Sequence, residues 1–242
     1  MDWKDEKKSD RIIVALDCEP YEAFDLGQVL AGHARWVKVG MTLYYATGPS
    51  IVRKLHAMGF KVMVDLKLHD IPYQVYGAAQ SLGYAGADLI TVHASGGEAM
   101  MSSAQRGARK GAAQISFDNP VPAVCAITVL TSMDDVTLES VGVKSSVAEQ
   151  VQFLAKLANG SGLDGVVCSP QEAADMRALL GPDALVVTPG VRPEGTAALD
   201  QSRVATPAEA FAAGASHLVI GRPITRSPTP VKAFDEIAAS VN

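Results

Sequence analysis

The sequence predicts one α/β domain folded as a (β/α)8 TIM barrel, and three observations favour this fold class. The 242-residue chain contains eight short apolar runs separated by segments with helical character. The runs are apolar almost throughout, which is typical of parallel strands covered on both faces. The chain length is close to the roughly 250 residues of such a barrel, and no Pro- or Ser-rich linker divides the chain.

The apolar runs are the predicted strands. They are rich in Val, Ile and Leu and occupy residues 11–17, 36–41, 61–67, 88–93, 121–130, 164–168, 184–188 and 216–221. Helices are predicted between them, for example at residues 22–30, 49–58 and 171–180, where apolar residues recur at three- and four-residue spacing. A doubly wound open sheet is the alternative, because a count of strands does not prove that the sheet closes.

Composition narrows the class of protein. A net charge of −5 argues against a nucleic-acid-binding surface. No apolar run reaches the roughly 18 residues of a membrane helix, and the charged residues 1–10 lack the apolar core of a signal peptide. The three cysteines are widely separated and odd in number, so they predict neither a disulfide framework nor a zinc site. We expect a cytoplasmic protein with a polar tail at residues 1–10 and a barrel domain at residues 11–242.

Charged residues gather where the predicted strands end, which is where TIM barrels place their functional groups. Those of the first three runs are Asp17, Lys38, Asp65, Lys67 and Asp70. Arg192 and the Gly221-Arg222 pair follow the last two runs, where barrels commonly bind phosphate. Because alternate residues of a strand share a face, Asp65 and Lys67 are expected to point the same way. With Lys38 from the neighbouring strand they would form a Lys-Asp-Lys row. Such a row could also be an ion-pair network that only stabilises the fold and has no chemical role.

The third run carries a motif of a known family. Its residues Asp65-Leu66-Lys67-Leu68-His69-Asp70-Ile71-Pro72 resemble the D-x-K-x-x-D signature of orotidine 5'-monophosphate decarboxylases, including the His-Asp-Ile-Pro ending. Further blocks are similar to the family in order and spacing: Leu16-Asp17, Val37-Lys38-Val39-Gly40, Thr91-Val92-His93-Ala94, Val129-Leu130-Thr131-Ser132, Thr188-Pro189-Gly190-Val191-Arg192, Asp200-Gln201-Ser202-Arg203 and Gly221-Arg222-Pro223-Ile224. The resemblance therefore covers almost the whole chain after the first ten residues.

The resemblance implies a lyase that needs no cofactor and no metal and converts orotidine 5'-monophosphate to UMP and carbon dioxide, the last step of de novo pyrimidine (UMP) biosynthesis. Lys67 would stabilise the C6 carbanion and then protonate it, and Asp65 would lie beside the substrate carboxylate. Lys38 would bridge the carboxylates and the ribose, and Asp17 would contact a ribose hydroxyl. The other substrate-binding residues that it implies are Ile71, Gln74, Thr131, Arg192, Gln201, Gly221 and Arg222.

The resemblance also implies a homodimer with shared active sites, in which Asp70 reaches into the site of the partner subunit. Asp70 also stands just before Ile71 and Pro72, so it is a candidate N-cap of the following helix. The sequence departs from the family after this motif, where Tyr73 and Gln74 replace the usual Asn-Thr. Gln74 is expected to take over the hydrogen bond that the threonine makes to the ribose of the partner's ligand.

Two other functions fit part of the pattern. A magnesium-dependent sugar-phosphate decarboxylase or aldolase of the same superfamily keeps D-x-K-x-x-D, but it has an acidic residue where this chain has Lys38. A cation there would repel magnesium. A non-catalytic phosphate-binding barrel would not need Lys38, Asp65 and Lys67 together. We therefore expect a small nucleotide as the ligand, and neither a nucleic acid nor a membrane as a partner.

Overall fold

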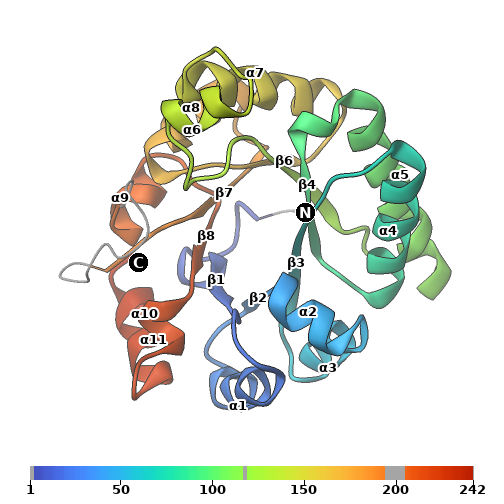
Figure 1. The fold of residues 1–242 in the computed structure, drawn as a ribbon. Helices are drawn as coiled ribbons and strands as arrows, with labels where there is room; N and C mark the ends of the chain where they lie inside the picture. Colours follow the sequence, from blue (N-terminus) through green and yellow to red (C-terminus); the bar gives the residue numbers. More distant parts are fainter. Residues whose placement is uncertain (1–2, 117–118, 194–204, 242) are drawn as a thin grey trace.

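Eight parallel strands close into a barrel in the computed structural model, which describes residues 3–116, 119–193 and 205–241. The strands are β1 (Ile12–Ala15), β2 (Trp36–Gly40), β3 (Lys61–Leu68), β4 (Leu89–His93), β5 (Ala123–Ile127), β6 (Gly165–Val167), β7 (Leu185–Pro189) and β8 (His217–Ile220). They pair in chain order, and β8 pairs with β1 to close the ring (Figure 1). The predicted TIM barrel is confirmed, and an open doubly wound sheet is excluded.

Helices surround the barrel on its outside (Figure 1). They are α1 (Pro20–Leu30), α2 (Met41–Thr47), α3 (Ser50–Ala57), α4 (Pro72–Ala85), α5 (Glu98–Ile115), α6 (Asp135–Ser140), α7 (Val147–Gly160), α8 (Ala173–Leu180), α9 (Pro207–Ala212), α10 (Arg222–Thr225) and α11 (Pro230–Ala239), with short 3₁₀ turns at η1 (Ser9–Arg11), η2 (Ala94–Gly96) and η3 (Pro170–Glu172). The helix predicted at residues 171–180 therefore begins as a 3₁₀ turn. Among the described residues, no helix has both the length and the apolar character needed to cross a membrane.

Most residues of the strands are apolar because the two faces of each strand belong to two different cores. Ile13 and Ala15 of β1 lie in the inner cluster, which also contains Trp36 and Met63. Ile12, like the other alternate residues of β1, packs into the larger cluster between the barrel and the helices. Both faces are buried, so neither needs polar residues, which explains why the strands were recognisable as continuous apolar runs.

The N-terminal segment covers the end of the barrel at which the strands begin. Its Trp3 ring lies 6.4 Å from the ring of His217, the first residue of β8, and the Arg11 guanidinium lies 5.3 Å from the Trp3 ring. His217 also packs edge-on against Trp36, the first residue of β2, at 5.5 Å. Burial, and then the nearby basic residues, lower the pKa of His217 to about 3, so this ring is neutral. The described part of the polar segment expected at residues 1–10 is thus packed on the barrel.

Helices α4 and α5 lie so close that glycines are required between them. A β-carbon at Gly107 would lie 2.2 Å from the carbonyl oxygen of Tyr76, and one at Gly111 would lie 2.0 Å from that of Gln80. Both distances are far below any van der Waals contact, so a side chain at either position would separate the helices. Helix α4 follows β3, which carries the first part of the motif, and α5 follows β4.

Gly111→Ala is expected to lower the free energy of unfolding by about 1–3 kcal/mol, because the added methyl group overpacks the α4–α5 contact. Gly77→Ala in α4 is the matched control. No atom lies within 4 Å of a β-carbon built at Gly77, so the better helix propensity of alanine should stabilise the protein by roughly 0.5–1 kcal/mol. Urea unfolding of both variants measures the two effects. Equal shifts in one direction would contradict the close-packing argument.

Candidate active site

A cavity of about 420 Å³ lies at the end of the barrel where the strands finish. Its volume is within the roughly 300–1,000 Å³ of typical small-ligand sites. Eight of the residues singled out in the sequence line it: Asp17, Lys38, Asp65, Lys67, Thr131, Arg192, Gly221 and Arg222. Apolar residues complete the wall, among them Met63, Ile127 and Val219. Closure of the barrel therefore brings residues from both ends of the chain to one cavity.

One side of the cavity carries a row of alternating charges. The Lys38 Nζ lies 2.7 Å from Asp17 Oδ1 and 3.6 Å from Asp65 Oδ2, and the Lys67 Nζ lies 2.9 Å from Asp65 Oδ2. The Lys38 and Asp65 side chains are only 8% and 11% exposed. Charges this buried are tolerated when each has an opposite charge beside it. The Lys-Asp-Lys row expected from the sequence is present, and Asp17 extends it.

The third strand is irregular where it carries these charges. The pairing of β3 with β4 shifts register between Val64 and Leu68, so Asp65 and Lys67 lie in a bulge. Lys67 has a φ of 51°, a left-handed conformation that costs a non-glycine residue about 1–3 kcal/mol. The two side chains still point the same way, as alternation predicts, because both line the cavity whereas Leu66 and Leu68 pack on the outer side of the strand. The irregular register and the left-handed Lys67 were not predicted.

Asp65 is held ionised by its neighbours. Burial by itself would raise the pKa of this carboxyl group. The positive charges of Lys38 and Lys67 outweigh burial, together with hydrogen bonds from Lys67 and Thr91, and the net effect lowers the pKa of Asp65. The cavity therefore presents a fixed negative charge between two ammonium groups at neutral pH.

A second part of the cavity wall is basic. Arg192 follows β7, and Arg222 is the first residue of α10, after Gly221 at the N-cap. Arg226 also lines the cavity and forms an ion pair of 2.9 Å with Glu22. The sequence reasoning missed Arg226, although its spacing of four from Arg222 is the spacing that places two side chains on one helix face. Three guanidinium groups at one end suit an anionic group such as a phosphate.

Three of the predicted site residues that the structure describes do not line this cavity. Asp70 and Ile71 border a separate shallow depression on the surface, and Gln74 is exposed in the first turn of α4. Gln201 lies outside the described residues. The N-cap of α4 is Ile71, and the Asp70 carboxylate accepts a hydrogen bond from the Ile71 N–H instead of capping the helix. The N-cap alternative for Asp70 is therefore wrong.

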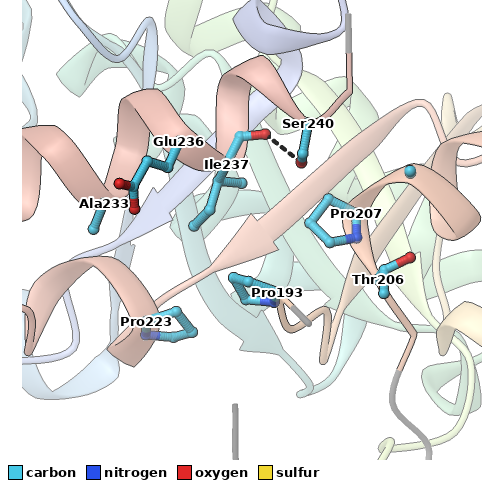
Figure 2. Close-up of a pocket in the computed structure, with 9 residues that line it drawn as sticks. Pro193, Thr206, Pro207, Pro223, Ala233, Glu236, Ile237 and Ser240 are labelled. Carbon is cyan, nitrogen blue, oxygen red and sulfur yellow. Dashed lines mark hydrogen bonds between the residues drawn. The ribbon is translucent and has the colours of Figure 1, made fainter. Parts of the chain in front are cut away.

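A second groove, of about 510 Å³, lies among α9, α10 and α11 (Figure 2). Pro207, Pro223 and Ile237 from these three helices line it, with Pro193 beside them. The described residues along this groove include Glu236 but no lysine, arginine or histidine. An anionic ligand would find no counter-charge there, so the cavity at the strand ends is the candidate active site.

The fold and the cavity together define a class of protein. A closed (β/α)8 barrel carries charged residues at the C-terminal ends of its strands, where the active sites of TIM-barrel enzymes lie. The cavity wall holds an ion-paired row of lysines and carboxylates, and it also holds arginines suited to an anion. The molecule is therefore a TIM-barrel enzyme that binds a small anionic ligand at the C-terminal ends of its strands.

The chain belongs to the Orotidine 5'-phosphate decarboxylase / HUMPS family, which its residues 10–237 match. It is 48% identical to the protein named Orotidine 5'-phosphate decarboxylase of Moorella thermoacetica, over 96% of this chain and 92% of that protein. For the protein of the same name from Anaeromyxobacter sp. the identity is 46%, over 97% and 100% of the two chains. The crystal structure of Orotidine 5'-phosphate decarboxylase from Lactobacillus acidophilus is similar with a TM-score of 0.85 and 40% identity, covering 96% of this chain and 99% of the other. The family resemblance inferred from the motifs is confirmed.

The contact between Lys38 and Asp65 should give a measurable coupling energy. Lys38→Met and Asp65→Asn each leave a buried charge with one partner fewer, which should lower the free energy of unfolding by about 2–3 kcal/mol. The double variant should lose about 1–3 kcal/mol less than the sum of the two single variants. Urea unfolding of the four proteins measures this difference.

The control for this cycle is the exposed pair of Lys232 and Glu236, at 3.8 Å in α11. Its coupling energy should stay below about 0.5 kcal/mol, because water screens exposed pairs. Additive effects at Lys38 and Asp65 would show that the row is not energetically coupled.

Proposed function

We propose that this chain catalyses the decarboxylation of orotidine 5'-monophosphate to UMP and carbon dioxide, the last step of de novo UMP synthesis. The observation that carries this proposal is the row of Lys38, Asp65 and Lys67 in one cavity with the basic wall formed by Arg192, Arg222 and Arg226. Such a cavity offers separate places for a reacting carboxylate and for a phosphate. The relatives named Orotidine 5'-phosphate decarboxylase, at 48% and 46% identity, support the same reaction.

Lys67 is the proposed proton donor. The bond between C6 and the carboxylate breaks, carbon dioxide leaves, and the electron pair stays on C6. The Lys67 ammonium group, 2.9 Å from Asp65, stabilises this carbanion and then transfers a proton to it. A cation already in place when the negative charge develops lowers the barrier without reorganisation. The neutral amine left on Lys67 regains its proton from water before the next turnover.

Asp65 and Lys38 act beside the reacting carbon. The ionised Asp65 would lie next to the substrate carboxylate, and their repulsion is relieved as carbon dioxide departs. Lys38, between Asp17 and Asp65, bridges the carboxylates and the ribose, and Asp17 accepts a hydrogen bond from a ribose hydroxyl. The four charges together align the substrate along the row.

The remaining predicted residues divide between the two ends of the substrate. Thr131 supplies a hydroxyl near the pyrimidine, and Arg192 and Arg222 bind the phosphate, with the backbone amide of Gly221. Gln201 is proposed to close over the phosphate and the base. Binding energy from the phosphate, which is remote from C6, is then available at the reacting centre.

The magnesium-dependent alternative is less well supported. The Lys38 ammonium group lies between the carboxylates of Asp17 and Asp65, the position that a divalent cation would require. In the described parts of the chain, no three or more His, Cys, Asp or Glu side chains are grouped so that they could hold a metal ion. The charge of Lys38 therefore favours the nucleotide decarboxylase over the sugar-phosphate enzyme.

A direct assay tests the proposed function. The purified protein, treated with a chelator, is mixed with orotidine 5'-monophosphate, and loss of the ultraviolet absorbance of the substrate is followed. Turnover in the presence of chelator is expected. No turnover would refute the proposal, and turnover only after magnesium is restored would favour the alternative.

Lys67→Ala should lower kcat by at least about 10³-fold, since it removes both the charge at C6 and the proton donor. The variant should still bind UMP, because the basic wall is untouched, and isothermal titration calorimetry measures this. Lys61→Ala is the matched control on the same strand. Lys61 lies at the opposite end of β3, where it pairs with Glu6. A Lys67→Ala enzyme with near-normal kcat would exclude the proposed role.

The proposed active form is a homodimer with shared sites. Asp70, Ile71 and Gln74 are exposed in the single chain and do not line its own cavity. Two aromatic side chains near the same end of the barrel are also strongly exposed: Tyr45 at 76% and Tyr73 at 81%. Burial of these apolar rings against a second copy would bring Asp70 to the partner's cavity. Gln74 would then make the hydrogen bond to the ribose of the partner's ligand that the threonine makes in the family.

Asp70→Ala should lower activity far more than stability, because the exposed side chain contributes little to the fold. Mixing this variant with Lys67→Ala tests the shared site directly. Each heterodimer has one cavity with Lys67 and Asp70 both intact, so random reassociation should restore about one quarter of the wild-type sites. Activity is measured after the two inactive proteins are mixed. If mixing restores nothing, or if Asp70→Ala alone turns over normally, the shared-site proposal fails.

The cytoplasm is the proposed compartment for this reaction. Cys18, Cys125 and Cys168 are free and buried, which suits a reducing environment. Burial, followed by the nearby acidic groups, raises the pKa of Cys18 to about 11. Burial also raises the pKa of Cys125 and of Cys168, which disfavours the reactive thiolate form at all three positions.

A further inference from the structure

Thr91 connects the two central residues of the row through one hydroxyl group. It lies in β4 and is completely buried. Its Oγ1 accepts a hydrogen bond from the Lys67 N–H at 3.0 Å and donates one to Asp65 Oδ1 at 2.8 Å. Thr91 does not line the cavity, so it has no direct route to a ligand.

The hydroxyl bonds the backbone of Lys67 where the pairing of β3 with β4 is irregular. Regular pairing stops at Val64 and resumes at Leu68, and within this stretch the Lys67 N–H donates to the Thr91 side chain. The left-handed conformation of Lys67 persists only if its surroundings hold it. Thr91 is the contact that holds the backbone N–H of Lys67.

The same hydroxyl also orients the Asp65 carboxylate. Oδ1 accepts from Thr91, and Oδ2 remains directed at the ammonium groups of Lys67 and Lys38, at 2.9 and 3.6 Å. Rotation of the carboxylate would break one of these contacts. A single oxygen atom therefore fixes the backbone of the proposed proton donor and the plane of the neighbouring carboxylate.

We propose that Thr91 is a positioning residue that holds Lys67 and Asp65 in the geometry required for proton transfer to C6. This inference rests on the proposed function. Thr91 acts through the two residues that it bonds and contacts no substrate. Removal of the Thr91 hydroxyl should therefore slow the chemical step and leave phosphate recognition by Arg192 and Arg222 intact.

Thr91→Val tests this inference, because valine has the shape of threonine without the hydroxyl. We expect kcat to fall by about 10²-fold, the usual effect of an ångström-scale misplacement of a catalytic group, with little change in KM. Thr91→Ser, which keeps the hydroxyl, should recover most of the lost kcat. Thr128→Val is the matched control: Thr128 is also buried, and its hydroxyl donates to the Val167 carbonyl oxygen, at 3.3 Å. This control should keep the kcat of the wild type.

A second measurement needs no turnover. The Thr91 hydrogen bond is one of the contacts that lower the pKa of Asp65. In Thr91→Val the Asp65 carboxyl group should titrate at higher pH than in the wild type, as followed by the ¹³C chemical shift of its side chain. Thr91→Ser and Thr128→Val should titrate like the wild type.

Three results would overturn the inference: a normal kcat in Thr91→Val, equal losses in Thr91→Val and Thr91→Ser, or a loss confined to KM. An unchanged Asp65 titration in Thr91→Val would also overturn it. Urea unfolding of all variants shows whether a loss of kcat merely follows a loss of folded protein, which would make Thr91 a structural residue only. Failure of the wild type to decarboxylate orotidine 5'-monophosphate would refute the proposed function instead, and the titration would still report on Thr91.

Discussion

The Asp65 carboxylate, placed between the ammonium groups of Lys38 and Lys67, is the interaction on which the rest of the site depends. At about 4 Å and an effective dielectric constant near 20, one such pair gains roughly 4 kcal/mol of Coulomb energy. Removing a charge from water costs several kcal/mol, and Asp65 offsets part of this cost for both lysines at once. The row is possible because β2 and β3 are neighbours and because Thr91 bonds both Lys67 and Asp65 where the pairing of β3 with β4 is irregular.

The two ends of the barrel have opposite character. At the end where the strands begin, Trp3 and Trp36 enclose a neutral His217, and the N-terminal segment covers the opening. At the other end the charges of Lys38 and Arg222 remain accessible within a cavity. This division follows the general arrangement of TIM barrels, in which one end contributes stability and the other carries the site. The strained Lys67 and the charged side chains therefore lie at the end of the barrel opposite the one that the N-terminal segment covers.

Much of the site could be predicted because strand ends are easy to recognise in this sequence. Apolar runs marked the strands, and the charged residues at their ends were Asp17, Lys38 and Asp65, which do line one cavity. The bulge at Lys67 could not be predicted, because spacing alone assumes a regular strand. Thr91 stands in one of the blocks that resemble the family, but its role could not be predicted either: a threonine is ordinary in a strand, and what its hydroxyl bonds depends on the register of the neighbouring strand.

The sequence by itself determined the fold class, the family and the identity of the charged residues. Strands buried on both faces appear in it as continuous apolar runs, and the D-x-K-x-x-D motif can be read directly from the order of the residues. Only the tertiary structure decided which atoms meet. The 2.9 Å contact of Lys67 with Asp65 lies where Lys67 has a left-handed φ and where the register of β3 against β4 shifts, and neither feature is visible in the residue spacing. The closeness of α4 and α5 likewise depends on their packing around Gly107 and Gly111. Such contacts arise from pairs of segments, and the pairing exists only once the barrel has closed.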